Sequence, residues 1–176
     1  MLSELEGAVL GLLARQGRLS AYAIRKEFER SPTSNWSASA GAIYPLVKRL
    51  IKRELIEEAP VEGDGRKTRR LAITGAGHRA LGAWVGSEDP AIFGPSADPL
   101  RARGFALLIL SPAEQHQRLS MWRTNTASKL QALHEERAED DEARSTGLDL
   151  VNYGAIKELE ARLNWIDAWL ERLDQA

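Results

Sequence analysis

Residues 39–53 read SAGAIYPLVKRLIKR, and no other stretch of this 176-residue chain says more about its fold. Apolar residues recur there at the three- and four-residue spacing of an amphipathic helix, and cations fill the intervening positions. The spacing predicts a helix that begins near Ser39 and has one apolar and one basic face. The apolar positions are Ile43, Leu46, Val47, Leu50 and Ile51, and the basic positions are Lys48, Arg49, Lys52 and Arg53.

Two shorter helices are predicted before this segment. The first carries an apolar stripe from Leu2 to Leu12 and ends at Gly17. Ser20 is placed to cap the second. That helix stops before Ser31-Pro32, because a residue that precedes proline disfavours helical backbone.

After the basic helix, the periodicity changes to that of strands. Residues 56–61 and 66–74 are predicted to form a two-stranded hairpin around Gly63-Asp64-Gly65, and a fourth helix runs from Thr74 through Trp84. The cations at the hairpin tip and returning strand are Arg66, Lys67, Arg69 and Arg70. This order of elements is that of a winged helix-turn-helix, whose third helix enters the major groove of DNA while the wing touches the backbone.

The rest of the chain is predicted to be helical. Residues 87–98 lack periodicity and read as a linker between a DNA-binding domain at 1–86 and a helical dimerisation and effector domain at 99–176. Ser111-Pro112-Ala113-Glu114 combines an N-cap, a proline at the first helical position and a capping-box glutamate. The predicted fold class is therefore mainly α, a winged helix followed by an all-helical domain.

The last predicted helix carries an apolar seam with alternating spacings of three and four residues. Such heptad spacing is typical of a coiled-coil surface that needs a matching partner. We therefore expect these residues to form the interface of a homodimer. The seam residues are Ile156, Leu159, Leu163, Ile166, Leu170 and Leu173.

Composition and charge exclude several classes of protein. The chain has no cysteine, which excludes disulfides, thiolate metal sites and cysteine nucleophiles. It has no long apolar run and no signal-peptide pattern, so we expect a cytoplasmic protein with no membrane partner. The net charge of −1 combines 14 basic and 9 acidic residues at 1–86 with 10 basic and 16 acidic residues afterwards. This asymmetry favours a polyanion-binding first half, with chance as the alternative.

No cofactor, metal or catalytic site is predicted. Residues 75–80 have the spacing of a dinucleotide fingerprint, but the preceding strand is charged and no second strand with a terminal acidic residue follows. The three histidines lack metal-ligand spacing, and neither a nucleophile elbow nor a phosphate loop is present. We therefore expect a protein that is not an enzyme.

Several of these motifs resemble those of the PadR-like transcriptional regulators. Residues 39–46 are similar to that family's S-x-G-x-[IVL]-Y-P-x-L segment, and Trp36 precedes them as it often does in the family. Glu54-Leu55-Ile56 and the Gly63–Gly65 wing tip follow in the family's order. The resemblance covers roughly residues 1–86, and the long helical second half is similar to the larger subfamily. It implies a homodimeric repressor that binds a palindromic operator in double-stranded DNA.

DNA contacts are expected from the basic helix and the wing. The resemblance implies groove contacts by Ser39, Tyr44 and Lys48. For Tyr44 the alternative is packing against Trp36 with the hydroxyl in water. Ser37 belongs to the same polar face. The wing residues expected to contact DNA are Arg66, Lys67, Arg69 and Arg70.

Aromatic side chains in the second half allow two interpretations. They either fill the interface between the last helix and its neighbours, or line an aromatic effector pocket, as the resemblance to phenolate-responsive members implies. The candidates are Phe105, Trp122, Trp165 and Trp169. A different function for the whole chain also stays open, that of a winged-helix module that docks proteins and has no specific DNA target.

Overall fold

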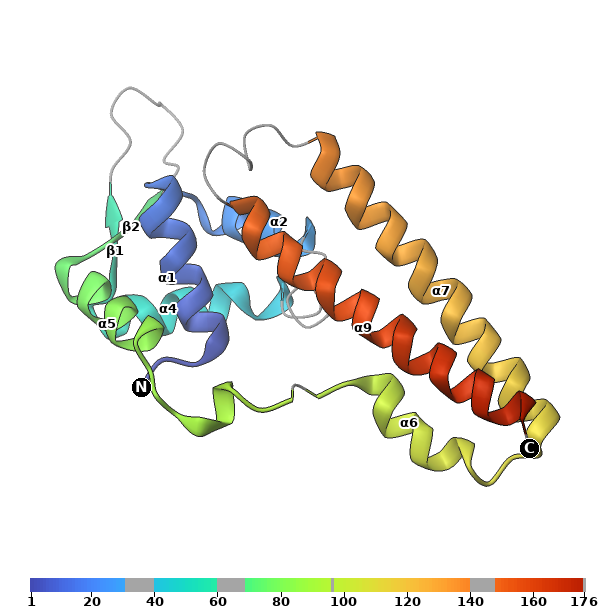
Figure 1. The fold of residues 1–176 in the computed structure, drawn as a ribbon. Coiled ribbons are helices and arrows are strands. Elements are labelled where there is room, and N and C mark those ends of the chain that lie inside the picture. Colours follow the sequence, from blue (N-terminus) through green and yellow to red (C-terminus); the bar gives the residue numbers. More distant parts are fainter. Residues whose placement is uncertain (31–39, 60–68, 96, 140–147, 176) are drawn as a thin grey trace. The chain divides into compact units, whose positions relative to one another are not determined.

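The computed structural model of the chain describes residues 1–30, 40–59, 69–95, 97–139 and 148–175. The chain divides into two compact units, residues 1–94 and 95–176, and the division falls within the predicted linker. The fold class is mainly α, as predicted (Figure 1). The elements are α1 (Glu4–Gln16), α2 (Ala21–Arg30), the 3-10 turn η1 (Ala40–Ala42), α4 (Ile43–Lys52), β1 (Ile56–Ala59), β2 (Arg70–Ile73), α5 (Gly75–Val85), the 3-10 turn η2 (Pro90–Ile92), α6 (Pro99–Leu107), α7 (Pro112–Glu139) and α9 (Leu148–Asp174).

Local side-chain caps set the bounds of α1 and α2. The Ser3 hydroxyl accepts the Glu6 N–H at 3.3 Å, and the Glu6 carboxylate accepts the Ser3 N–H at 3.0 Å, which makes a capping box. Gly17 ends α1 with φ 77°, where a side chain would be strained. The Ser20 hydroxyl accepts the Ala23 N–H at 3.0 Å, so the predicted cap of α2 is confirmed.

Helix α4 supplies the centre of the core in the first unit. The side chains of Ile43, Leu46 and Leu50 have no exposed surface. The predicted start of this helix near Ser39 is only partly matched, because residues 40–42 form a 3-10 turn and the α-helix begins at Ile43. Ala42 stands at the N-cap of α4 and has no side-chain group that can accept a capping hydrogen bond. The tighter 3-10 turn therefore precedes α4. The other buried core residues are Leu2, Val9, Leu10, Leu13, Ile24, Phe28, Val47, Leu55, Ile56 and Leu71.

The predicted hairpin is confirmed for its paired residues. Strands β1 and β2 are antiparallel, with Ile56 opposite Ile73 and Ala59 opposite Arg70, while the turn lies outside the described residues. Glu54, just before β1, has φ 56°, a left-handed conformation uncommon for a residue with a side chain. The Thr74 hydroxyl donates to the Glu54 carbonyl at 2.7 Å and holds this turn against the start of α5.

Helices α7 and α9 form an antiparallel pair in the second unit (Figure 1). The Arg123 guanidinium donates to Asp167 at 2.6 Å and links the two helices. The Ser111 hydroxyl accepts the Glu114 N–H at 3.4 Å, and the Glu114 carboxylate accepts the Ser111 N–H at 3.0 Å, so the predicted capping box of α7 is confirmed. Among the helices that the structure describes, none is long and apolar enough to cross a membrane.

Asp98 joins α6 to α9 within the second unit. Its carboxylate accepts the N–H groups of Leu100 and Arg101 at 2.7 and 3.2 Å and lies 2.8 Å from an Arg162 guanidinium nitrogen. Burial raises the pKa of Asp98, but these hydrogen bonds and the Arg162 charge outweigh it, so the pKa is lowered. The carboxylate is therefore ionised at neutral pH, when it both caps α6 and pairs with α9.

Candidate nucleic-acid interface

The exposed face of α4 presents a phenol and a cation one helical turn apart. Tyr44 is 47% exposed, and Lys48 is also exposed. The position of the helix backbone is fixed by its opposite face, because Ile43, Leu46 and Leu50 on that face are buried in the core. Within the described ranges, no carboxylate lies within ion-pair distance of Lys48. Its ammonium is therefore available to a phosphate or to a base edge.

Five residues of the sequence-based prediction lie outside the described residues. They include two candidates before η1 and two at the wing tip, and also the tryptophan that was the alternative partner of Tyr44. They are Trp36, Ser37, Ser39, Arg66 and Lys67.

The two remaining wing candidates lie at the start of β2, and both are exposed. Arg69 donates to the Glu58 carboxylate at 2.6 Å, across the hairpin. Arg70 lies opposite Ala59 in the antiparallel register. The sequence analysis did not assign Glu58 a role, although its place on the strand that pairs with a cation-rich strand was a usable signal. One of the wing cations is thus already paired within the hairpin.

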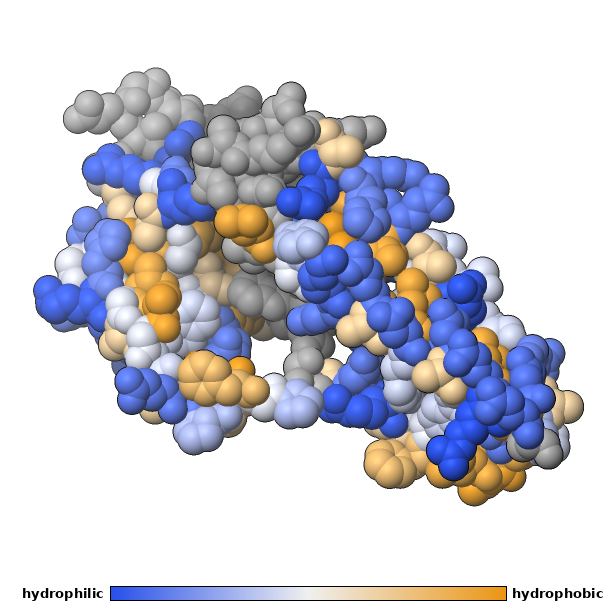
Figure 2. Space-filling view, viewed as in Figure 1, coloured by the Kyte–Doolittle hydropathy of each residue, from blue (hydrophilic) through white to orange (hydrophobic). Residues whose placement is uncertain are grey.

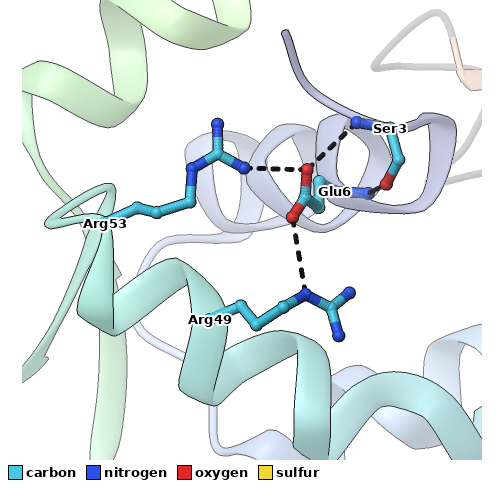
Figure 3. Close-up of polar contacts among 4 residues, drawn as sticks. All are labelled: Ser3, Glu6, Arg49 and Arg53. Carbon is cyan, nitrogen blue, oxygen red and sulfur yellow. Dashed lines mark hydrogen bonds and ion pairs between the residues drawn. The ribbon is translucent and has the colours of Figure 1, made fainter.

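Glu6, which the sequence analysis also left without a role, binds the basic face of α4 (Figure 3). Its side chain is 9% exposed and lies 3.0 Å from Arg53 and 3.8 Å from Arg49. Burial raises the pKa of Glu6, but the hydrogen bonds from Ser3 and Arg53 and the charges of both arginines lower it below its ordinary value. A buried, ionised carboxylate therefore joins the start of α1 to the end of α4. The S-x-x-E pattern at residues 3–6 is a capping-box signal that is not among the predictions above, and it gives no indication of the arginines.

The three tryptophans of the second unit form a continuous aromatic row. The rings of Trp122 and Trp165 stack with centroids 6.5 Å apart, and those of Trp165 and Trp169 meet edge to face at 5.6 Å. All three are partly buried and pack against a core formed by Leu107, Leu119 and Ile166. The row therefore lies between α9 and its neighbours and packs on the core of the second unit.

A small apolar slot opens beside this row. It has a volume of about 200 Å³ and lies between α6 and α9, and Figure 2 shows apolar side chains at the surface along α6. Phe105 on its edge is 80% exposed. Trp122 lines a different, neighbouring hollow, so the four predicted effector residues do not share one site. The slot is lined by Arg101, Gly104, Phe105, Leu108, Trp165 and Trp169.

The apolar seam of α9 is divided between the chain's own core and its surface. Ile156 and Ile166 have no exposed surface, so assigning these two to a dimer interface needs correction. They are core residues of this chain, because a heptad pattern does not distinguish a partner helix in the same chain from one in another. The other four seam residues are half-buried and keep surface that a second chain could cover: Leu159, Leu163, Leu170 and Leu173.

Comparisons with known proteins agree with this architecture. Residues 9–83 match the Transcriptional regulator PadR-like family. The Negative transcriptional regulator PadR of Bacillus subtilis is 28% identical over 175 residues, which cover 96% of this chain and 94% of that protein. Its crystal structure in complex with operator DNA superposes with a TM-score of 0.79 at 23% identity, covering 98% of this chain and 99% of that one.

Two further solved structures have the same fold. The complex of Bacillus subtilis PadR with p-coumaric acid has a TM-score of 0.77 at 24% identity and covers 97% of this chain and 98% of that one. The virulence activator AphA of Vibrio cholerae has a TM-score of 0.72 at 22% identity, with 98% and 99% covered. Over residues 9–83, the winged-helix unit is therefore similar to the PadR-like family of transcriptional regulators.

Proposed function

We propose that this chain is a sequence-specific DNA-binding repressor that acts as a homodimer and is released from DNA by a small aromatic effector. The observation that carries the proposal is the exposed pair Tyr44 and Lys48 on a helix whose opposite face is locked into the core. A helix held in this way can enter the major groove without losing its own packing. The operator complex of the Bacillus subtilis relative supports the same use of the fold.

We infer dimerisation from the small size of one DNA-binding winged-helix unit, which is called a head below. A single winged helix makes few base contacts, whereas two heads held in one assembly add their binding energies. Two-fold symmetry then requires a palindromic site, with half-sites separated by about 10 bp or a multiple of it. The half-buried seam residues of α9 are the surface that we assign to the partner chain.

The DNA-binding function is tested by selecting duplexes from a random library with the wild-type protein. We expect a palindrome to emerge and its affinity to fall steeply as salt rises, because bound phosphates release counterions. The specific duplex should bind about 10³-fold or more tightly than a random one. If no duplex is retained even at low salt, the alternative function, a winged-helix module that docks proteins, is favoured instead.

The dimer interface is tested by Leu163→Asp, which places a charge on the half-buried seam. We expect monomers in sedimentation velocity at micromolar concentration, since an unpaired carboxylate is costly in an apolar interface. Asn164→Asp adds the same charge at the exposed neighbouring position and should stay dimeric. A Leu163→Asp variant that remains dimeric would show that the chains pair elsewhere.

The effector is assigned to the slot beside Trp165 and Trp169. Its aromatic walls suit a flat ring, so planar aromatic compounds are the ligand class. The complex of the Bacillus subtilis relative with p-coumaric acid makes that compound the first probe.

Thermal unfolding with p-coumaric acid tests this assignment. At a ligand concentration 100 times Kd, we expect Tm to rise by about 5–10 °C, from about 2.7 kcal/mol of added stability. Trp169→Ala, measured against its own ligand-free Tm, should lose the shift, whereas Phe93→Ala, which removes an exposed aromatic that does not line the slot, should keep it. A shift that survives Trp169→Ala would place the ligand elsewhere.

A further inference from the structure

The exposed face of α4 carries two separate rows of side chains. At about 100° of rotation per residue, positions four apart lie nearly above one another. Tyr44, Lys48 and Lys52 therefore form one row, and Arg49 and Arg53 belong to a second row beside it. All five side chains are exposed. Charge alone does not distinguish the two rows, because each contains two cations.

Glu6 distinguishes them, because it contacts the second row only. One carboxylate oxygen lies 3.0 Å from an Arg53 guanidinium nitrogen, and the other lies 3.8 Å from the Arg49 Nε (Figure 3). Neither Lys48 nor Lys52 has a carboxylate at ion-pair distance in the part of the chain that the structure describes. The Glu6 carboxylate therefore opposes the charge of the arginine row and leaves the lysine row unopposed.

The carboxylate is held firmly in this position. It is almost wholly buried and accepts a backbone hydrogen bond from Ser3 within the cap of α1. Moving either arginine away would leave this buried charge with fewer partners, which is unfavourable, and more so for Arg53, which donates a hydrogen bond at 3.0 Å, than for Arg49 at 3.8 Å. The arginines are thus tied to α1 rather than free to follow a phosphate.

We propose that Glu6 is a positioning residue that withholds Arg49 and Arg53 from DNA and so raises the specificity of α4. The inference rests on the proposed DNA-binding function. Cations that reach only phosphates add affinity for every sequence alike and dilute the contribution of base contacts. With the arginine row withheld, binding depends on the row that contains Tyr44 and Lys48.

The test uses Glu6→Gln in the full-length protein. Glutamine keeps the capping box, since its amide oxygen can accept the Ser3 N–H, but it removes the charge that holds the arginines. Glu4→Gln is the matched control, because it removes one exposed carboxylate from the same helical turn, and within the described residues Glu4 forms no ion pair with either arginine. Kd is measured for the selected palindrome and for a random duplex between 50 and 200 mM salt.

For Glu6→Gln we expect a steeper dependence of log Kd on log salt, by about 2 to 4 per dimer for one or two new phosphate contacts at each of two heads. With both arginines engaged at both heads, random-duplex affinity should fall about 100-fold more than that of the wild type across this salt range. The ratio of specific to random affinity should fall several-fold. Glu4→Gln should match the wild type, and Glu6→Gln combined with Arg49→Gln and Arg53→Gln should restore the wild-type slope.

Two results would overturn the inference while leaving the proposed function in place. One is a folded Glu6→Gln protein, judged by circular dichroism, with the wild-type slope. The other is a variant that binds more weakly at an unchanged slope, which would make Glu6 a purely structural residue.

If Glu6→Gln does not fold, the single variants Arg49→Gln and Arg53→Gln decide the matter in its place. Arginines that are withheld leave the wild-type slope intact, so a slope reduced by about 2 per dimer in either variant overturns the inference. A wild-type protein without salt-dependent DNA binding would instead overturn the proposed function, and the inference with it.

Discussion

Lys48→Ala is expected to weaken binding of the selected palindrome by about 2–6 kcal/mol per dimer, from about 1–3 kcal/mol at each of two heads. Lys48 is exposed one turn after Tyr44, and no carboxylate in the described residues competes for its ammonium. Its loss removes a contact without disturbing the buried side of α4. Fluorescence anisotropy at one fixed salt concentration measures the change in Kd.

Arg79→Ala is the matched control for this experiment. It removes one exposed cation from α5 in the same unit, and so tests for a general effect of net charge. Equal losses in the two variants would mean that Lys48 contributes only through the overall charge. An unchanged Kd for Lys48→Ala would remove the assignment of α4 as the groove-reading helix.

Gly77→Ala is expected to lower the free energy of unfolding by about 1–3 kcal/mol or more, although alanine ordinarily favours helices. A Cβ on Gly77 would lie 2.1 Å from the Leu55 carbonyl oxygen and 2.7 Å from the Ile73 Cγ1. That carbonyl accepts the Thr74 N–H at 3.1 Å, so it cannot move away without disturbing the start of α5. Urea denaturation followed by circular dichroism measures the loss.

Gly82→Ala in the same helix provides the opposite expectation. Among the described residues, no atom outside the helix's own backbone lies within 4 Å of a Cβ built there, so helix propensity alone should act and stabilise the protein by about 1 kcal/mol. If Gly77→Ala proved as stable as Gly82→Ala, the close approach of α5 to the residues before β1 would be wrong. The contact also explains Gly77, whose spacing resembled a dinucleotide fingerprint, as a packing residue.

Features that depend on neighbours in the chain were predictable. Ser20 and Ser111 cap α2 and α7 as expected, because a capping hydrogen bond spans only three residues. The strands of the hairpin and the buried face of α4 followed from periodicity alone. For the candidate site, the same periodicity placed Tyr44 and Lys48 on the exposed face.

The remaining features depend on residues far apart in the chain. The basic face of α4 looked uniform until packing brought Glu6 to Arg49 and Arg53, more than 40 positions away. The row of tryptophans likewise divided into a core part and a slot only once α6 lay beside α9.

Periodicity and local hydrogen bonding were therefore enough to establish the mainly α fold class, the winged-helix order and the exposed face of α4. Only packing distinguishes residues of the same chemical type from one another. It determines which arginines pair with Glu6, which seam leucines remain partly exposed, and which tryptophans border the slot. The physical reason is that the spacing of residues along a helix or strand determines on which face of that element a side chain lies. The partner of that side chain depends on which other element packs against this face.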